Sequence, residues 1–316
     1  MTESLRVLMN GLIDYAGLFP PAKLPMSEAA TNYARDLMGP HSHALARFIC
    51  SASRLEELSE TGAMLMPGTY ATSGYQEMID AADPWSVSCV IDTALEPALH
   101  AIDAFNAHHD ETAHGRAKID AIELRVTEVH AIDEALDIIP EDLSVAIEFP
   151  KEAVAEDPRG YVAALAGNDA TAKIRCGGVT PDLIPSPEAV AGFIAACVHA
   201  QVPFKATAGL HHPVRGEQPL TYEDQPPRSV MHGFLNVFLG AALHYSDVID
   251  ADTLTECLRE TDPATFAFTN DRASWKGHSL TTHQLVRARE AFCVSYGSCS
   301  FDEPIADLKK LKLLNA

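Results

Sequence analysis

The chain has 316 residues, of which 47% are hydrophobic and 21% are charged, and its formal net charge at pH 7 is −21. This size and composition are typical of a globular protein with one large or two small domains, and they exclude an intrinsically disordered chain. The strong negative charge argues against nucleic acids and anionic membranes as partners, because both repel an acidic surface.

The cysteines and the hydropathy pattern predict a cytoplasmic protein. The seven cysteines are scattered, odd in number and without a CxxC spacing, which argues against a disulfide framework and a structural zinc site. No uninterrupted apolar run approaches the roughly 18 residues of a membrane helix, and the N-terminus lacks a signal-peptide core. We therefore expect no membrane partner and no cofactor, and a homo-oligomer is compatible with the sequence.

Strand-like runs of five to eight residues and longer helical runs alternate eight times along the chain. The expected strands are residues 11–17, 45–51, 85–92, 120–126, 144–149, the two runs around Lys173 and Lys205, and 265–270. The expected helices are residues 26–38, 54–61, 95–108, 131–139, 152–166, 187–200, 230–245 and 282–292. Residues 62–84 form a longer connection, with a turn at 67–68 and a short helix before Asp83.

This alternation predicts a (β/α)8 barrel formed by residues 1–316 as a single domain, because the chain contains no long Gly/Ser linker. An open doubly wound sheet would show the same alternation, but no G-x-G-x-x-G motif follows the first strand. Residues 301–316, acidic and then basic, are expected to pack as a short C-terminal extension.

Two lysines organise the most informative part of the chain. Lys173 and Lys205 each lie in a strand-like run and are each followed four positions later by a glycine, and the helix 187–200 separates the runs. This strand–helix–strand unit predicts that both lysines point to the same side of the sheet at the same height. Two adjacent ammonium groups are a poor structural pair, so the arrangement indicates a function.

Alternation along the strands predicts which charged residues share the barrel interior. Ionised groups are seldom buried unless they are paired or functional, and barrel active sites lie at the C-terminal mouth. A structural salt-bridge network filling the barrel is the alternative interpretation. The residues expected to converge there are Asp14, Asp92, Glu123, Arg125, Glu148, Lys173, Arg175 and Lys205. Thr207 shares the strand face of Lys205 and is a candidate for substrate binding.

The lysines indicate Schiff-base chemistry. Desolvation and a nearby cation favour a neutral, nucleophilic lysine, and Lys205 or Arg175 could supply that cation for Lys173. The neutral amine would condense with a carbonyl, and the resulting imine would act as an electron sink for the adjacent C–C bond. Asp92, Asp14 or Glu148 could transfer the protons, directly or through water.

These motifs resemble the deoxyribose-phosphate aldolase group of class I aldolases. The matching stretches are Leu12-Ile13-Asp14 with the apolar residues after it, Lys173-Ile174-Arg175-Cys176-Gly177 and Lys205-Ala206-Thr207-Ala208-Gly209, about a tenth of the chain. The resemblance implies a lyase of carbohydrate metabolism in which Lys173 forms the imine and Lys205 favours its neutral form. It also implies that Asp92 and Asp14 handle protons.

The substrate is expected to be a small aldehyde or ketone, and either a carboxylate or a phosphate on it is compatible with the sequence. Arg175 stands where the family has a small hydroxyl residue, and no glycine-rich phosphate-binding turn follows residues 265–270, where the chain reads Asn270-Asp271-Arg272-Ala273. Arg175 or Arg215 could instead hold a carboxylate in bidentate fashion. Arg125 and Glu123 are further candidates for substrate binding.

Histidines and a long loop follow the second lysine strand. His211, His212 and His232 could hold a divalent metal, but hydrogen-bonding or substrate-contacting roles are the simpler interpretation. The proline-rich residues 211–228 are expected to form a lid over the mouth. Two other functions stay open: an isomerase or hydrolase in which a lysine is the general acid or base, with or without that metal, and a non-catalytic barrel that binds a small molecule.

Overall fold

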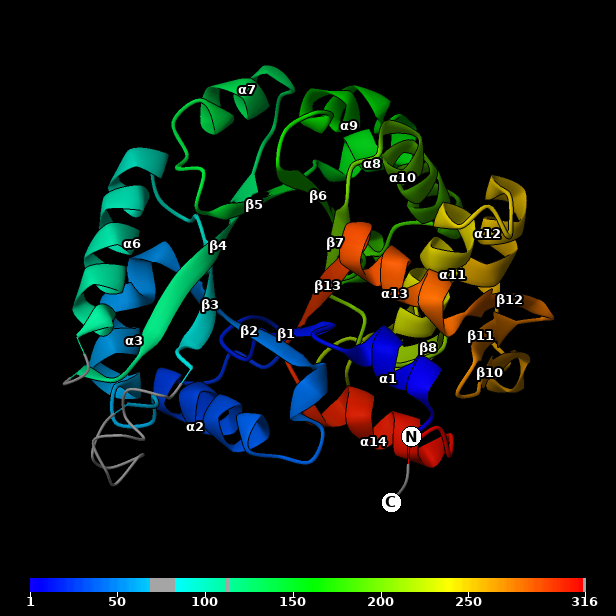
Figure 1. Cartoon of the computed structure of the whole chain (residues 1–316), viewed down its shortest axis with the longest axis horizontal. Coiled ribbons are helices and arrows are strands. Elements are labelled where there is room, and N and C mark those ends of the chain that lie inside the picture. The colour runs from blue at the N-terminus through cyan, green and yellow to red at the C-terminus, as the bar shows by residue number, and fades with distance from the viewer. Residues whose placement is uncertain (69–82, 112–113, 315–316) are drawn as a thin grey trace.

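The computed structural model describes residues 1–68, 83–111 and 114–314 and confirms the (β/α)8 barrel, with helices surrounding a closed ring of strands (Figure 1). All eight barrel strands are parallel to their neighbours, and the ring runs β1-β13-β7-β6-β5-β4-β3-β2. They are β1 Ile13–Tyr15, β2 Leu45–Ser51, β3 Trp85–Val90, β4 Ala117–Arg125, β5 Ser144–Glu148, β6 Ala170–Arg175, β7 Phe204–Thr207 and β13 Cys293–Ser298.

The helices pack around this ring because alternate strand residues are apolar and point outward. On β5, for example, Val145 and Ile147 are buried on the face opposite Glu148. The main helices are α1 Glu3–Met9, α2 Met26–Leu37, α3 Leu55–Gly62, α6 Leu95–Asp110, α7 His130–Leu136, α8 Lys151–Glu156, α9 Arg159–Leu165, α10 Pro187–Ala200, α11 Phe234–Tyr245, α12 Ala251–Arg259, α13 Thr282–Ala291 and α14 Asp302–Lys310.

Helix α10, between the two lysine strands, has the bounds predicted from the sequence. Ser186 caps its N-terminus by accepting a hydrogen bond from the backbone N–H of Ala189, and Gln201 ends it in the left-handed conformation. The segment Pro181–Ala200 has the length and hydropathy of a membrane-crossing helix, which the uninterrupted apolar runs did not indicate. In the barrel Phe193 and Ile194 of this segment are fully buried in the core.

The eighth strand is not where the sequence predicted it. Residues 265–270 contribute β10 (Phe266–Phe268) to a separate antiparallel sheet with β11 (Arg272–Trp275) and β12 (His278–Thr281). A two-residue turn at Lys276-Gly277, with positive φ at both positions, joins β11 to β12, as in a tight hairpin. The strand that closes the barrel is β13, so the helix expected at 282–292 (α13) precedes the last strand instead of following it.

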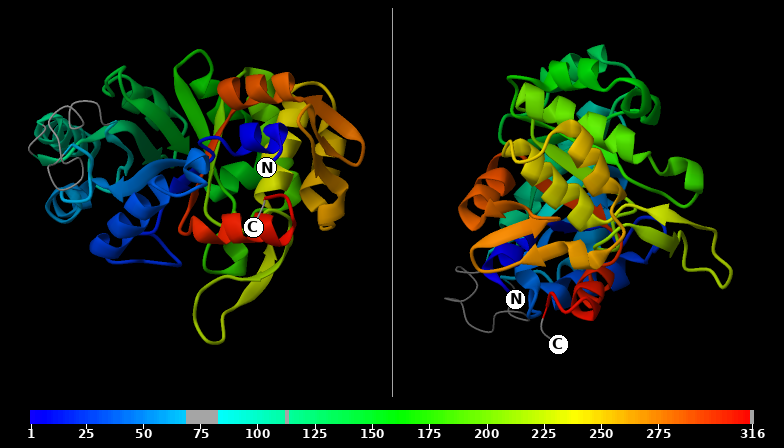
Figure 2. Two further views of the ribbon diagram at one scale, coloured as in Figure 1. Left: turned by 60° about the horizontal axis from the view of Figure 1, so that its bottom comes forward. Right: turned by 90° about the vertical axis from the view of Figure 1, so that its right-hand side faces the viewer.

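Three smaller expectations are also corrected. The helix expected at 152–166 is two helices, α8 and α9, because Pro158 interrupts the hydrogen-bonding pattern. The third strand ends at Val90, two residues short of Asp92. Residues 211–228 are not a simple loop but contain β8 (Gly216–Pro219), which pairs with β9 (Arg228–Met231) in a hairpin that projects from the barrel in both views of Figure 2.

The C-terminal extension forms α14 as expected, with Ile305 and Leu308 buried against the body. The short helix expected before Asp83 lies outside the described residues.

Candidate functional site

Lys173 and Lys205 lie side by side in the barrel interior, as the sequence predicted, because β6 and β7 pair them in register. Both side chains are buried, but a carboxylate stands between them. Glu123, on β4, places Oε2 at 2.7 Å from Lys173 Nζ and Oε1 at 2.7 Å from Lys205 Nζ. The expectation that the two ammonium groups crowd each other directly is therefore wrong.

Each lysine also contacts a second carboxylate. Lys173 Nζ is 2.7 Å from Glu148 Oε2, and Lys205 Nζ is 2.7 Å from Asp14 Oδ2. Arg175 extends the row, with Nη2 at 3.2 Å from Glu148 Oε1. The result is an alternating chain of three carboxylates and three cations across β1, β7, β4, β6 and β5.

Electrostatics inside this network favour the charged forms. Burial alone would raise the pKa of Glu123, but the two lysines outweigh burial and hold this pKa well below its ordinary value. Burial likewise opposes the charge on Lys205, yet Asp14 and Glu123 raise the pKa of its ammonium group. These contacts therefore favour the charged form of Lys205.

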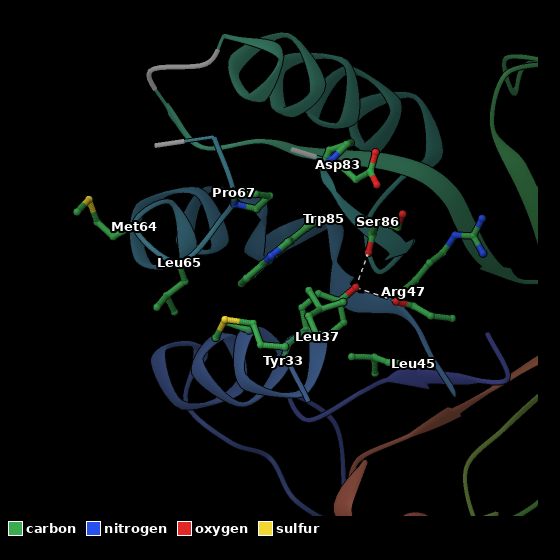
Figure 3. Close-up of a pocket in the computed structure, with 14 residues that line it drawn as sticks. Tyr33, Leu37, Leu45, Arg47, Met64, Leu65, Pro67, Asp83, Trp85 and Ser86 are labelled. Carbon is green, nitrogen blue, oxygen red and sulfur yellow. Dashed lines mark hydrogen bonds between the residues drawn. The ribbon is translucent and has the colours of Figure 1, made fainter. Parts of the chain in front are cut away.

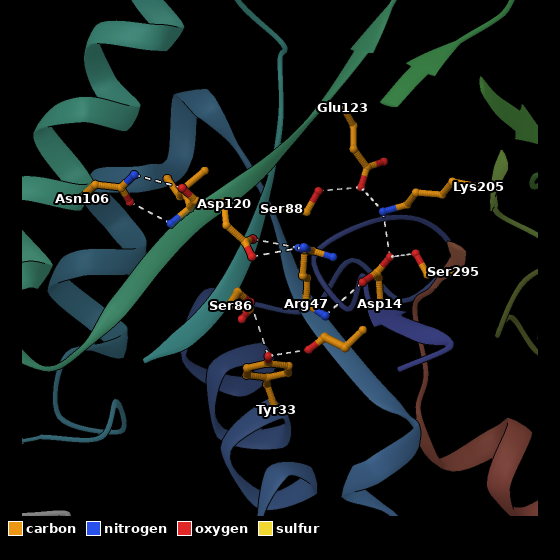
Figure 4. Close-up of polar contacts among 12 residues, drawn as sticks. Asp14, Tyr33, Arg47, Ser86, Ser88, Asn106, Asp120, Glu123, Lys205 and Ser295 are labelled. Carbon is orange, nitrogen blue, oxygen red and sulfur yellow. Dashed lines mark hydrogen bonds and ion pairs between the residues drawn. The ribbon is translucent and has the colours of Figure 1, made fainter. Parts of the chain in front are cut away.

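Neighbouring strands hold the carboxylates in place (Figure 4). Ser88 Oγ on β3 donates to Glu123 Oε1 at 2.8 Å, and Ser295 Oγ on β13 donates to Asp14 Oδ2 at 2.5 Å. The backbone N–H of Arg47 on β2 donates to Asp14 Oδ1 at 2.9 Å. Because these buried acceptors have donors besides the lysines, their orientation is fixed by the sheet itself.

A cavity of about 270 Å³ opens onto one end of the network. Lys173, Glu123, Glu148 and Arg175 line it, whereas Lys205 lies behind Glu123 and is not among the lining residues. Apolar groups complete the wall, and Thr207, His211 and Cys299 add further polar ones. The two lysines therefore differ in access: a small molecule in the cavity meets Lys173.

Glu148 pairs with two arginines, of which Arg175 lines the cavity. Burial opposes its charge, but Lys173 and Arg175 outweigh burial and lower the pKa of its carboxyl group. Arg125 is largely exposed, and its Nε is 4.0 Å from Glu148 Oε1. Arg125 therefore lies at the rim of the barrel. The prediction from strand alternation, which placed it in the interior, is wrong.

Two predicted site residues lie elsewhere. Asp92 is exposed beyond the end of β3, where it accepts hydrogen bonds from the backbone N–H and Oγ of Ser53, at 3.0 and 2.5 Å. Arg215 does not line the cavity; its backbone N–H donates to Asn236 Oδ1 at 2.9 Å at the start of the hairpin. Their assignment to the barrel interior and to substrate binding is therefore not supported by their positions.

The three histidines do not converge on a metal. His211 Nδ1 pairs with Glu303 Oε2 at 2.9 Å, His212 Nδ1 with Asp307 Oδ2 at 2.6 Å, and His232 Nε2 contacts the carbonyl of Pro185 at 2.8 Å. Within residues 1–68, 83–111 and 114–314, no three His, Cys, Asp or Glu side chains are grouped to hold a metal ion. Of the three histidines, His211 lines the cavity with Lys173.

The mouth contains polar residues that the sequence did not single out. Cys299 follows β13 and lies with its Sγ 3.6 Å from the hydroxyl of Tyr222 in the hairpin, and Glu303 lies on α14. Ser295 and Cys299 were missed because the sequence analysis assigned the last barrel strand to residues 265–270 instead of β13. Recognising β13 would have placed both Ser295 and Cys299 at the site.

A larger cavity, of about 920 Å³, lies beside α2 and the first residues of β2 and β3 (Figure 3). Its wall is mostly apolar, with Tyr33, Leu45 and Trp85 prominent, and Tyr33 Oη donates to the carbonyl of Ala46 at 2.8 Å. This cavity lies at the end of the barrel where the strands begin, whereas the catalytic groups of such barrels lie at the C-terminal ends of the strands. Its size alone does not make it the reactive site.

Comparison with protein-family models, with curated proteins and with solved structures finds no significant match to this chain. The (β/α)8 fold is thus established by the strand order and register, and function must be argued from the site.

Proposed function

We propose that the protein is a class I aldolase-type lyase, in which Lys173 forms a Schiff base with a small aldehyde or ketone and the adjacent C–C bond is made or broken. One observation carries the proposal: Lys173 is the lysine that reaches the cavity, and its Nζ lies 2.7 Å from Glu123 and 2.7 Å from Glu148, which line the same cavity. The cavity volume of about 270 Å³ suits a substrate of a few carbon atoms.

The proposed reaction begins with proton transfer. An ammonium group is not nucleophilic, so Lys173 must first lose a proton to solvent, relayed by Glu148 in the cavity wall, before the amine attacks the carbonyl carbon. The resulting carbinolamine loses water and leaves an iminium ion. That cation withdraws the electron pair of the adjacent C–C bond while a base removes the proton from the departing alcohol. Lys205 remains charged and keeps Glu123 ionised.

The substrate is proposed to lack a phosphate near the end of β13. Barrel enzymes frequently hold phosphate at the loops after the last two strands and the following helix N-terminus. Here α14 begins with Asp302 and Glu303, and the loop before it reads Ser298-Cys299-Ser300-Phe301. Two acidic side chains in the first turn repel an anion. Arg175 at the cavity is better placed for a carboxylate.

The hairpin is proposed to limit access to the mouth. Leu220, directly after β8, is buried, and Tyr222 Oη contacts Cys299 Sγ at the end of β13. Opening of the hairpin would separate these groups and widen the approach to Lys173. Protection of the hairpin from proteolysis by bound substrate is the expected result.

Reductive trapping tests the imine directly. The protein is incubated with glycolaldehyde, acetaldehyde or pyruvate and sodium cyanoborohydride, and the adduct is located by peptide mass spectrometry. We expect saturable labelling of Lys173, faster than that of Lys151, an exposed lysine that reports non-specific alkylation. Lys173→Met is expected to abolish the saturable component. Labelling of Lys173 no faster than Lys151 with all three probes would contradict the proposal.

The complete pairing of Lys173 also supports a second function, in which its ammonium group donates a proton without forming an imine, as in an isomerase. Exchange of substrate C–H for deuterium in the absence of any trapped adduct is the expected signature of that function.

A further inference from the structure

His211 lies in the wall of the cavity, in a constellation separate from the lysine network. It follows β7, and its side chain is 10% exposed. Nδ1 is 2.9 Å from Glu303 Oε2 on α14, and Nε2 is 3.8 Å from Cys299 Sγ. His211 also lines a smaller cavity, of about 100 Å³, beneath the hairpin, so it stands between that space and the cavity of Lys173.

The surroundings of His211 favour its protonated form. Burial alone would lower the pKa of the imidazole, but Cys299 and Glu303 outweigh burial and raise this pKa to about 10. In turn, burial opposes the charge of Glu303, whereas His211 lowers the pKa of its carboxyl group. At neutral pH the cavity wall therefore presents an imidazolium, with Nδ1 engaged by the carboxylate.

We propose that His211 is the general acid of imine formation at Lys173 and that Glu303 is its positioning residue. This inference rests on the proposed Schiff-base function and assigns a step that the lysine network leaves without a donor. The carbinolamine formed on Lys173 must lose its hydroxyl group. A proton from His211 Nε2 joins that hydroxyl as the C–O bond breaks, which releases water and leaves the iminium ion and a neutral imidazole.

Charge conservation explains why His211 suits this step. One positive charge, on the imidazolium, becomes one positive charge, on the iminium, and no net charge is created in the buried cavity. Of the two other cations that line the cavity, Lys173 is consumed as the nucleophile and Arg175 does not give up its proton. Return of a proton from solvent to His211 completes the cycle.

Several titratable groups face His211 and can influence its protonation. Glu303 and Cys299 contact it directly, and Tyr222 reaches both of them from the hairpin. His212, on the same loop, acts on Glu303 through space and is itself paired with Asp307. Across the cavity stand the charged ends of the lysine network: Glu123, Glu148, Lys173 and Arg175.

The test measures the rate of reductive trapping of glycolaldehyde on Lys173 between pH 6 and pH 11 in four proteins: wild type, His211→Gln, Glu303→Gln and His244→Gln. His244 is the control, because its Nδ1 also makes a hydrogen bond, here with the carbonyl of Ile249, but it lies on α11 outside the site. We expect His211→Gln to slow trapping about 100-fold, the lower end of general acid catalysis, while the final adduct remains on Lys173. His244→Gln is expected to trap at the wild-type rate.

Glu303→Gln tests the role of His211 through the pH dependence of the trapping rate, which a purely structural role of Glu303 would leave unchanged. Loss of the carboxylate lowers the pKa of His211, so the fall in rate at alkaline pH should begin at a lower pH than in wild type. Trapping by His211→Gln at the wild-type rate, or an alkaline limb unchanged in Glu303→Gln, would overturn the role of His211 and leave the imine proposal standing. Absence of any Lys173 adduct in wild type would overturn both.

Discussion

Replacing Glu123 with glutamine is expected to destabilise the protein by about 3–5 kcal/mol at pH 7, the cost typical of removing one partner from a buried ion pair. Glu123 is the carboxylate shared by both lysines, at 2.7 Å from each Nζ. The isosteric amide preserves the side-chain volume but leaves five charges where six balanced one another. Urea unfolding followed by circular dichroism measures the change.

A second substitution separates charge from packing. In Glu123→Gln/Lys205→Met, the unbalanced ammonium group is removed together with the carboxylate, so part of the lost stability should return. Asp157→Asn is the control, because its ion pair with Arg159 is exposed at the surface and its loss should leave the urea midpoint close to that of wild type. A loss below about 1 kcal/mol in Glu123→Gln would show that the network contributes little to stability.

The difference in stability between wild type and Glu123→Gln should depend on pH. The folded-state pKa of Glu123 lies below its ordinary value of 4.5, so its contribution to stability is present above pH 4.5 and is lost as the pH falls below that value. Wild type and Glu123→Gln should therefore differ most at neutral pH and converge in acid.

Alternation along the strands correctly predicted four of the groups that meet in the barrel. Glu123, Glu148, Lys173 and Lys205 each lie between apolar residues of a regular strand, so their direction follows from parity alone. The partner of each group could not be predicted, because pairing depends on the register between strands. A carboxylate from β4 reaches between lysines on β6 and β7, which sequence spacing does not encode.

The failures have local causes. Asp92 has the correct parity, but the strand ends before it, and its carboxylate binds Ser53 instead. The strand β13 was overlooked because its sequence, CVSYGS, has a single β-branched residue and contains glycine. The roles of His211 and His212 depend on α14, whose position follows from that strand.

Introducing a side chain at Gly177 or Gly209 is expected to disrupt the end of the site where β6 and β7 meet the cavity. A Cβ at Gly177 would lie 2.6 Å from the Cα of Gly209, and a Cβ at Gly209 would lie 2.7 Å from the Cα of Gly177. Both contacts are with backbone, so the two strand ends must separate. The glycine four positions after each lysine is thus explained by close approach of the chains.

We expect Gly177→Ala to destabilise the protein by about 1–3 kcal/mol through overpacking. Gly209→Ala should cost about 1 kcal/mol more, because Gly209 has φ +73°, which alanine adopts only with strain. Since either substitution already separates the strands, the double variant should lose less than the sum of the two. Gly178 and Ala208 line the cavity beside these positions, so trapping at Lys173 should slow in both variants.

Gly192→Ala is the matched control for these substitutions. Gly192 lies on the exposed side of α10 with no atom within 4 Å of a new Cβ, so alanine should stabilise the helix by about 0.5–1 kcal/mol. Urea midpoints and Lys173 trapping rates are measured on the two single variants, the double variant and Gly192→Ala. Together they distinguish a clash at the strand ends from a general effect of replacing glycine with alanine. If Gly177→Ala and Gly209→Ala match wild type in both measurements, close approach of the strand ends does not shape the cavity, and Lys173 is positioned by its carboxylates alone.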